Sequence, residues 1–148
     1  MESGFSKVPI PSNQIHRMEA EKNIEENALS YEKLLLSLLE KGSFDLVMLG
    51  MGEDGHTASL FPGTKALEAK NRLVVANFVP QKNTWRMTLT FDCINASKNI
   101  VIYVLGKSKQ EMLAKLFHSS SPTFPIEHVG SKRHKALWIA DTDAAAAL

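Results

Sequence analysis

Residues 44–57 read FDLVMLGMGEDGHT, an apolar run that ends in a glycine-rich turn. From Phe44 to Leu49 the run is almost continuously apolar, which is typical of a strand in a parallel sheet that is covered on both faces. Asp54 and His56 follow in the turn at the carboxyl end of this strand. Ligand sites in open α/β sheets form at that end of the strands. This stretch therefore predicts both a buried parallel strand and a functional turn.

The residues before this stretch predict a helix over residues 17–41. Apolar positions recur there at intervals of four and three residues, the spacing of one helix face: Ile24, Ala28, Tyr31, Leu35 and Leu38. Glutamates crowd the first half of the segment, where the helix dipole favours negative charge.

The residues after this stretch predict further strands and helices. Three mostly apolar runs predict buried strands: residues 73–79, 100–105 and 136–140. Residues 86–91 instead alternate, which predicts a strand with Arg86, Thr88 and Thr90 on one face. Two helices are expected, one over residues 108–117 and one alanine-rich helix capped by Asp141 or Thr142. This order indicates an α/β fold with a mostly parallel sheet and helices on both faces.

The composition limits the class of protein. A length of 148 residues suits a single domain over 1–148, and 44% hydrophobic with 22% charged residues is ordinary for a soluble domain. A formal net charge of +1 offers no electrostatic footprint for nucleic acid or an anionic membrane, so we expect neither as a partner. Cys93 is the single cysteine, which excludes an internal disulfide and suits a reducing compartment, so we expect a cytoplasmic protein.

The glycines of the turn formally match a dinucleotide-binding fingerprint, G-x-G-x-x-G, at Gly50, Gly52 and Gly55. That fingerprint needs a long helix at the third glycine to hold a pyrophosphate, and Pro62 ends any such helix early. Residues 79–81, where the ribose-binding acid should lie, contain no carboxylate. We therefore do not expect a nicotinamide cofactor.

A second glycine turn, Gly-Lys-Ser at residues 106–108, resembles the tail of a phosphate-binding P-loop. The full motif requires a glycine where this chain has Val101, so a nucleotide P-loop is excluded. The turn can still offer backbone N–H and ammonium groups to an anion. Lys107 and Lys109 suit solvated positions in a first helical turn equally well.

Asp54 and His56 form the strongest candidate for catalysis. Histidine is the side chain most easily used as a general base near neutral pH, and a nearby carboxylate orients its ring or supports its charged form. The other histidines are scattered without metal-ligand spacing: His16, His118, His128 and His134. We therefore expect no metal site, and we interpret Cys93 as a buried, inert thiol.

Taken together, residues 44–63 closely resemble the signature of the 6-phosphogluconolactonases. The resemblance continues at Tyr31-Glu32 and in three later segments: residues 85–90, 106–109 and 136–141. The related glucosamine-6-phosphate deaminases share the Gly-Asp-Gly-His core but follow it with a Phe-Asn-Glu-Pro stretch that supplies a catalytic carboxylate. This chain has Ser59-Leu60-Phe61-Pro62 instead and no acid until Glu68. That difference favours the lactonase.

The resemblance implies a three-layer Rossmann-like fold and hydrolysis of 6-phospho-D-glucono-1,5-lactone to 6-phosphogluconate, a step of the pentose phosphate pathway. A strained ester needs only an activated water, a proton carrier and a stabilised oxyanion, so neither a metal nor an organic cofactor is expected. His56 would deprotonate the attacking water, and Asp54 would orient His56. By similarity to the superfamily, Arg86 and Lys109 would bind the substrate phosphate.

The glycine turn has an expected role of its own in this mechanism. Its backbone N–H groups would face the developing oxyanion, so we expect Gly50, Gly52 and Gly55 to bind the substrate. Glu53 stands where the signature often has proline, a change that the turn should tolerate.

The resemblance is confined to the carboxyl-terminal part of the family. Nothing in residues 1–13 resembles the family's Gly-Gly-Ser-Thr-Pro phosphate turn or its Asp-Glu-Arg segment. We therefore expect this chain to be the C-terminal portion of a larger domain. Two alternatives stay open: an enzyme similar to the deaminases, and a non-catalytic fragment that binds sugar phosphates. The oligomeric state is not predicted.

Overall fold

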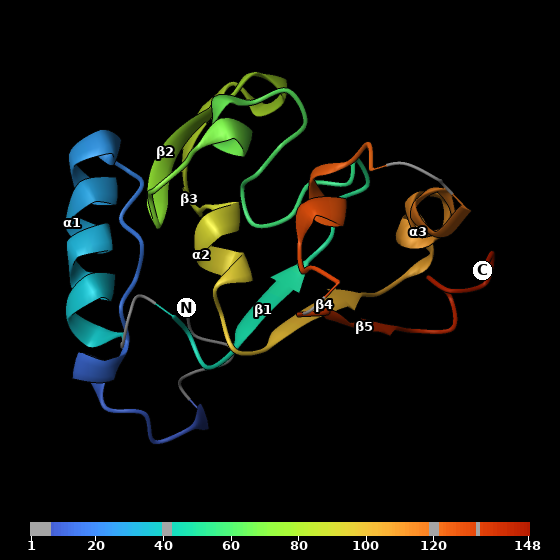
Figure 1. Ribbon diagram of the computed structural model, residues 1–148, viewed down its shortest axis with the longest axis horizontal. Helices are drawn as coiled ribbons and strands as arrows, with labels where there is room; N and C mark the ends of the chain where they lie inside the picture. The colour runs from blue at the N-terminus through green and yellow to red at the C-terminus, as the bar shows by residue number, and fades with distance from the viewer. Residues whose placement is uncertain (1–6, 40–42, 119–121, 133) are drawn as a thin grey trace.

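The structure is a computed structural model that describes residues 7–39, 43–118, 122–132 and 134–148. A parallel sheet with strand order β1-β4-β5 lies beside an antiparallel hairpin, β2-β3 (Figure 1). The strands are β1 (Val47–Gly50), β2 (Val74–Val79), β3 (Thr84–Leu89), β4 (Ile100–Val104) and β5 (Leu137–Ala140). The helices are α1 (Ile24–Leu38), α2 (Phe91–Asn95) and α3 (Gln110–His118). This mixed α/β architecture confirms the predicted fold class.

Short 3-10 helices connect these elements. They are η2 (Ser12–Gln14), η4 (Lys65–Glu68), η5 (Pro80–Lys82), η6 (Lys107–Lys109) and η7 (Pro125–His128). None of the helices in the described ranges is long and apolar enough to cross a bilayer.

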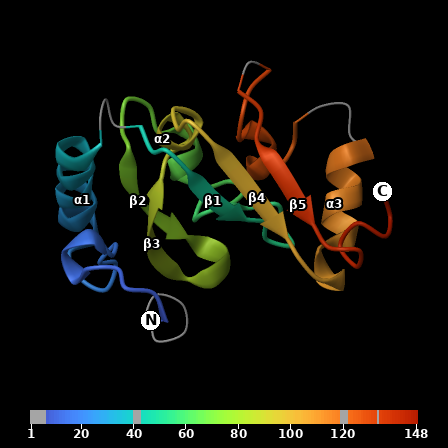
Figure 2. The same ribbon diagram turned by 90° about the horizontal axis from the view of Figure 1, so that it is seen from below.

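The parallel sheet packs its main core on one face. Ile100, Ile102 and Val104 of β4 point to that face and pack in one cluster with Met112 and Leu113 of α3. The register places two rows of residues on the other face: Met48–Val101–Leu137 and Gly50–Tyr103–Ile139. In these rows Met48 is 63% exposed, and Figure 2 shows the three strands uncovered from this side. Within the described residues, the sheet is therefore covered on one face, whereas the prediction placed helices on both.

The hairpin corrects the prediction for residues 73–79, which were expected to be a strand of the parallel sheet. β2 instead pairs antiparallel with β3, with Val74 opposite Leu89 and Val79 opposite Thr84. Val74 and Met87 pack against Ala28 and Leu35 of α1. The opposite face of the hairpin meets the loop that follows His56. The sequence of β2 therefore lacks an alternation of apolar and polar residues because the strand is covered on both faces. It has this pattern without belonging to a parallel sheet.

The predicted strand over residues 86–91 is right in the face shared by Arg86 and Thr88 and wrong in its end. Thr88 is buried on that face, where its hydroxyl accepts a hydrogen bond from the N–H of Ser59. Thr90 is not a strand residue but the N-cap of α2, and its hydroxyl accepts from the N–H of Cys93.

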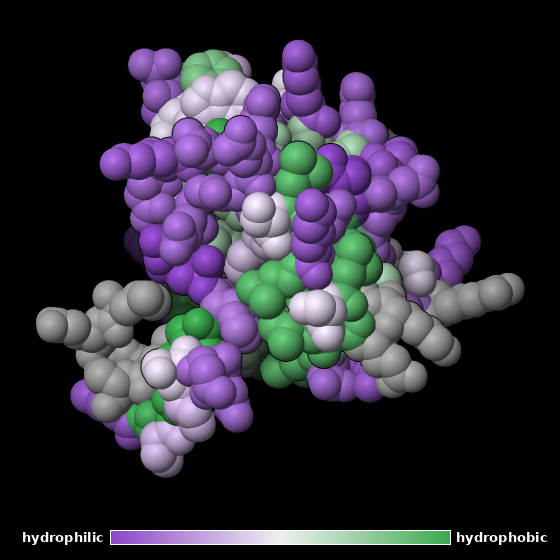
Figure 3. Space-filling view, turned by 90° about the vertical axis from the view of Figure 1, so that its left-hand side faces the viewer, coloured by the Kyte–Doolittle hydropathy of each residue, from purple (hydrophilic) through white to green (hydrophobic). Residues whose placement is uncertain are grey.

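The first helix begins at Ile24, later than predicted, because Asn23 has a left-handed backbone (φ 45°). The expected end of this helix at Lys41 lies outside the described residues. α1 carries Leu29 and Leu36 on a second face, where each side chain is about half exposed. Apolar and polar side chains mix on this end of the molecule (Figure 3).

The expected alanine-rich helix at the end of the chain is wrong, because residues 142–147 form turns. Asp141 does cap this segment, since its carboxylate accepts from the N–H of Ala144. The same carboxylate also accepts from the N–H of Gly106 and so ties the segment to the turn that follows β4.

Glu32 joins α1 to the hairpin. Its carboxylate accepts from the N–H groups of Leu73 (2.6 Å) and Val74 (3.0 Å) and from Nε of Arg72 (2.8 Å). Partial burial raises the pKa of Glu32, but these hydrogen bonds outweigh it and hold the pKa below its ordinary value. A depressed pKa means that the carboxylate stabilises the fold above the pKa of the unfolded chain, and that this stability is lost as the pH falls.

We expect Glu32→Gln to lower the free energy of unfolding by about 1–3 kcal/mol at neutral pH, because a neutral amide replaces an acceptor of three hydrogen bonds. The difference from the wild type should shrink as the pH falls through the ordinary pKa of a glutamate, about 4.3, and vanish once the pH is below the depressed pKa of the folded carboxylate. Urea unfolding across pH measures both effects. Glu26→Gln, an exposed change on the same helix, is the control, and an equal loss in both variants would contradict the assignment.

Candidate active site

The turn after β1 folds back on itself between Gly50 and Thr57. The N–H of Gly52 donates to the carbonyl of His56 (2.8 Å), and the N–H of Gly55 donates to the carbonyl of Gly52 (3.1 Å). The buried hydroxyl of Thr57 donates to the carbonyl of Gly50 (2.8 Å) and closes the turn at the end of the strand. This closure brings the His56 ring back over Gly52.

Asp54 and His56 meet in this turn, as the sequence predicted. Nδ1 of His56 lies 2.5 Å from Oδ1 of Asp54, and the same oxygen accepts from the backbone N–H of His56 (3.2 Å). The His56 ring stacks on the buried ring of Phe61, with centroids 3.9 Å apart and planes 19° from parallel. Because an ionised carboxylate only accepts hydrogen bonds, Nδ1 carries the proton and Nε2 of the neutral ring keeps its lone pair.

The carboxyl group of Asp54 is held in its ionised form. Partial burial raises its pKa, but the hydrogen bonds from the ring and the backbone of His56 outweigh this and place the pKa below its ordinary value. An ionised Asp54 fixes the tautomer of His56 and stabilises the imidazolium that forms when the ring takes a proton. The pair therefore has the arrangement of a general base with an orienting acid.

Two of the glycines serve the shape of the turn. A Cβ atom at Gly52 would lie 2.0 Å from Nδ1 of His56, so any side chain there displaces the ring. Gly55 has a positive φ (73°), and a Cβ atom there would meet Phe124 at 2.7 Å. The N–H groups of Gly52 and Gly55 both donate within the turn in this structure, and their expected role toward an oxyanion stays a prediction. At Gly50 a Cβ atom would meet nothing within 4 Å.

Lys109 lies at the turn, whereas Arg86 lies on the neighbouring hairpin. Nζ of Lys109 is 3.9 Å from Oε1 of Glu53, in a side chain that is only 24% exposed. Arg86 is exposed on β3, on the same face as Thr88, which binds the loop after His56 through Ser59. Within the described residues, the guanidinium of Arg86 has no hydrogen bond or ion pair. Lys109 is therefore available to an anion at the end of β1, and Arg86 to an anion on the face of the hairpin that meets the loop after His56.

Sequence reasoning missed Asn77 and Phe61 as parts of this site. Asn77 is 1% exposed in the middle of β2, and its side chain holds the carbonyl of Ser59. An asparagine inside an otherwise apolar strand was the signal, because a buried amide must find hydrogen-bond partners. Phe61 lies in the signature block, but nothing in the spacing showed that its ring backs His56.

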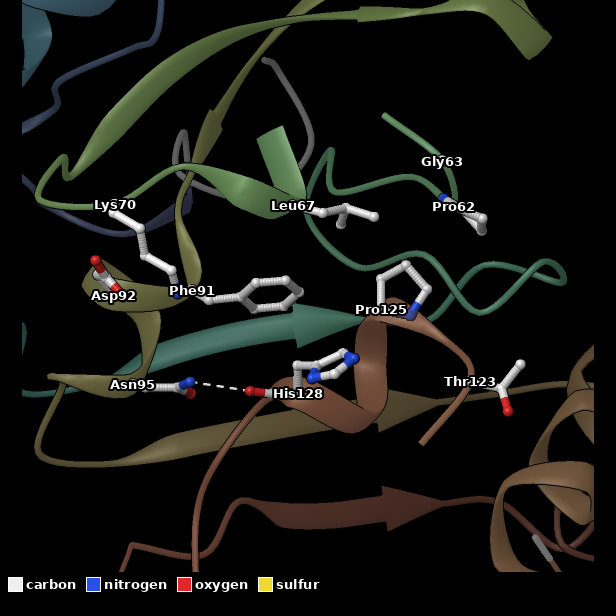
Figure 4. Close-up of a pocket in the computed structure, with 10 residues that line it drawn as sticks. All are labelled: Pro62, Gly63, Leu67, Lys70, Phe91, Asp92, Asn95, Thr123, Pro125 and His128. Carbon is white, nitrogen blue, oxygen red and sulfur yellow. Dashed lines mark hydrogen bonds between the residues drawn. The ribbon is translucent and has the colours of Figure 1, made fainter. Parts of the chain in front are cut away.

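A separate cavity of about 470 Å³ lies between α2, η4 and η7 (Figure 4). It is lined by Pro62, Gly63, Leu67, Lys70, Phe91, Asp92, Asn95, Thr123, Pro125 and His128. Asn95 does not offer its amide to a ligand, because it donates to the carbonyl of His128 and accepts from the N–H of Gly130. The lining contains neither His56 nor Asp54. We therefore place the candidate active site at the end of β1, where these two residues meet, and not in this cavity.

The remaining candidates carry no catalytic chemistry in the structure. No group of three or more His, Cys, Asp or Glu residues in the described part of the chain is arranged to hold a metal ion. Cys93 is fully buried, and this burial together with the charge of Glu32 raises the pKa of its thiol to about 11. The thiol is therefore protonated at neutral pH, in keeping with the predicted inert role.

Comparison with known proteins places this site in a family. The family model described as glucosamine-6-phosphate isomerases/6-phosphogluconolactonase matches residues 1–138. This chain belongs to that family. It is 47% identical over 133 residues to the 6-phosphogluconolactonase of Chlamydia pneumoniae, covering 88% of this chain and 51% of that protein. The chain spans about half the length of this relative and of two other Chlamydia 6-phosphogluconolactonases that it matches.

Solved structures of the family share the fold. The crystal structure of the devB protein superposes with a TM-score of 0.85 at 33% identity, over 96% of this chain and 62% of that one. The 6-phosphogluconolactonase of Thermotoga maritima superposes with a TM-score of 0.75 at 31% identity, over 93% of this chain and 61% of that one. The resemblance read from residues 44–63 is therefore confirmed, and with it the Rossmann-like fold of the family.

We expect Gly52→Ala to separate the His56 ring from Asp54, because the new Cβ atom would lie only 2.0 Å from Nδ1 of His56 and 2.6 Å from Oδ1 of Asp54. Nitrogen-detected NMR of the histidine rings should then show loss of the fixed Nδ1–H tautomer at His56. Gly50→Ala is the matched control, since its Cβ atom enters open space. An unchanged His56 signal in Gly52→Ala would contradict the geometry of the turn.

Proposed function

We propose that this chain carries the catalytic turn of a 6-phosphogluconolactonase, which hydrolyses 6-phospho-D-glucono-1,5-lactone to 6-phosphogluconate in the pentose phosphate pathway. The observation that carries the proposal is the contact of 2.5 Å between His56 and Asp54 at the open end of a parallel strand. Relatives that bear this name are 46–47% identical to the chain, which supports the same reaction here.

The proposed reaction needs one base and one proton donor. Nε2 of His56 takes a proton from a water molecule as its oxygen forms a bond to C1 of the lactone. The tetrahedral intermediate then breaks the bond between C1 and the ring oxygen, and the imidazolium returns the proton to that oxygen. Asp54 stabilises the charged ring between the two steps. General catalysis of this kind is worth roughly 10²–10⁴-fold.

The substrate phosphate is assigned to Arg86 and Lys109. The planar guanidinium of Arg86 can bind two phosphate oxygens at once, and Lys109 acts as a point charge. The present partner of Lys109 is weak, because Glu53 is 68% exposed and 3.9 Å away. A phosphate dianion can replace this partner at little cost. Substrate binding by Gly50, Gly52 and Gly55 stays part of the proposal, although the N–H groups of Gly52 and Gly55 donate within the turn in this structure.

A deaminase of amino-sugar phosphates is the second candidate. A monomeric glucosamine-6-phosphate deaminase superposes with a TM-score of 0.66 at 26% identity, over 86% of this chain and 56% of that one. The carboxylate expected of that reaction is missing after His56, and the next acid, Glu68, is exposed in η4. A non-catalytic sugar-phosphate-binding role is the third candidate. Purified chain incubated with freshly generated lactone, beside buffer alone, and separately with glucosamine 6-phosphate distinguishes the three.

We also assign residues 1–148 to one sugar-phosphate domain in the cytoplasm. The single cysteine supports a reducing compartment. The near-neutral charge supports a small phosphorylated substrate rather than nucleic acid or a membrane surface as the partner.

We expect His56→Ala to lower the enzymatic rate of lactone opening by at least about 100-fold without loss of folding, because it removes the base. Asp54→Asn should also lower the rate while it preserves the shape of the side chain. The rate above the spontaneous background measures both effects. His128→Ala is the control, because this histidine lines the separate cavity. Near-normal turnover in His56→Ala would reject the mechanism.

We expect Arg86→Ala and Lys109→Ala to raise KM for the phosphorylated lactone and to leave hydrolysis of the unphosphorylated lactone nearly unchanged. Contacts to a remote phosphate contribute binding energy only when the phosphate is present. Steady-state kinetics on both lactones test this, with Lys115→Ala as the control, since Lys115 pairs with Glu111 on the surface of α3. Equal losses on the two lactones would show that the cations support the fold instead.

A further inference from the structure

Two buried polar side chains hold the loop after His56 against the hairpin. The N–H of Ser59 donates to the hydroxyl of Thr88 (3.1 Å), and Nδ2 of Asn77 donates to the carbonyl of Ser59 (2.8 Å). Asn77 and Thr88 are each 1% exposed. Both backbone groups of Ser59 are therefore fixed by the hairpin, three residues after His56.

A second route leads from Asn77 to the His56 ring. Nδ2 of Asn77 also donates to the hydroxyl of Thr64 (3.0 Å), and this hydroxyl donates to the carbonyl of Phe61 (2.8 Å). Phe61 stacks on His56. We call Asn77, Thr88 and Thr64 the loop clamp. Through it, the position of the His56 ring depends on residues that do not touch the ring.

The loop does not hold this shape by its own preference. Ala58 has a left-handed backbone (φ 50°), which costs free energy in a residue with a side chain. Oδ1 of Asn77 accepts from the N–H of Ala66 (3.4 Å), so the donors and the acceptor of the amide are all used in one orientation. Asparagine is disfavoured inside strands, and a bulky apolar residue would suit β2 better. The retained amide therefore serves the geometry of the loop.

The same strands carry Arg86. It lies directly opposite Asn77 in the register of the hairpin and two residues before Thr88 on the same face. Every hydrogen bond of the clamp to Ser59 thus also fixes the strand of Arg86 relative to the loop of His56. One structural unit sets the separation between a cation and a base.

We propose that Asn77 and Thr88 are positioning residues that hold His56 and Arg86 at the separation required by a phosphorylated lactone. The inference rests on the proposed function for the identity of the substrate. With the clamp loosened, the phosphate can still reach Arg86, but C1 of the lactone no longer lies correctly at His56. The clamp therefore determines how much the phosphate accelerates hydrolysis, that is, the preference for the phosphorylated over the unphosphorylated lactone.

Thr88→Val tests the proposal, because valine keeps the shape of threonine and removes the acceptor for Ser59. Thr88→Ser restores the hydroxyl. Thr90→Val is the matched control, because Thr90 is also fully buried. Its hydroxyl bonds to backbone groups of Arg72 and Cys93, and neither of these residues is in the loop after His56. Thr64→Val cuts the second route and serves if Thr88→Val fails to fold.

Two measurements are made on the 148-residue chain. The first is the proton NMR shift of the His56 ring, which stacking on Phe61 moves upfield. We expect this shift to move toward the free-histidine value in Thr88→Val or Thr64→Val, and to stay in place in Thr88→Ser and Thr90→Val. The second is the ratio of kcat/KM for the phosphorylated lactone to kcat/KM for the unphosphorylated lactone. We expect this ratio to decrease by about 10-fold to 100-fold in Thr88→Val and Thr64→Val, and not in Thr88→Ser or Thr90→Val.

An unchanged His56 shift in folded Thr88→Val, or an equal change in Thr90→Val, would overturn the proposal. So would an unchanged ratio of kcat/KM, since a purely structural residue lowers both activities together. If the wild-type chain opened neither lactone, the proposed function would fail by itself, whereas the His56 shift would still decide whether the clamp positions the ring.

Discussion

The close approach of the His56 ring to Gly52 is the constraint on which the site depends. Because a Cβ atom at Gly52 would lie only 2.0 Å from the ring, the turn can close in this way only over a glycine. Closure brings Nδ1 to Asp54, and the charged carboxylate then fixes which ring nitrogen is free to take a proton. The geometry that the proposed catalysis needs is thus built into the backbone of a single turn at the end of β1.

The rest of the structure supports this turn from two sides. The parallel sheet positions the turn, which lies at the end of β1. The hairpin holds the loop after the turn, because Asn77 and Thr88 form hydrogen bonds with Ser59. The two apolar clusters of the described residues meet at shared side chains, Phe44 and Leu89, which pack against both. The hairpin and the sheet therefore act on the site as one packed body, although no described strand of one pairs with a described strand of the other.

The sequence predicts the parts of the site that are local. The apolar run and the polar turn after it located Asp54 and His56, because both lie within a few residues of one strand end. The sequence could not show that Thr88 is buried, since its partner Ser59 lies 29 residues away. Nor could it show that the N–H groups of Gly52 and Gly55 are used within the turn, which depends on how the chain closes. The prediction for β2 was wrong for a related reason. A strand covered on both faces has the same unalternating apolar sequence in a parallel sheet and in an antiparallel one.

The most direct measurement locates the ligand without relying on turnover. The isotope-labelled chain is titrated with 6-phosphogluconate, the stable product of the proposed reaction, while backbone and side-chain NMR signals are followed. The account predicts that the changes gather at Glu53, His56, Arg86 and Lys109. Changes centred instead on Lys70, Phe91 and His128, which line the separate cavity, would contradict the placement of the site at the end of β1.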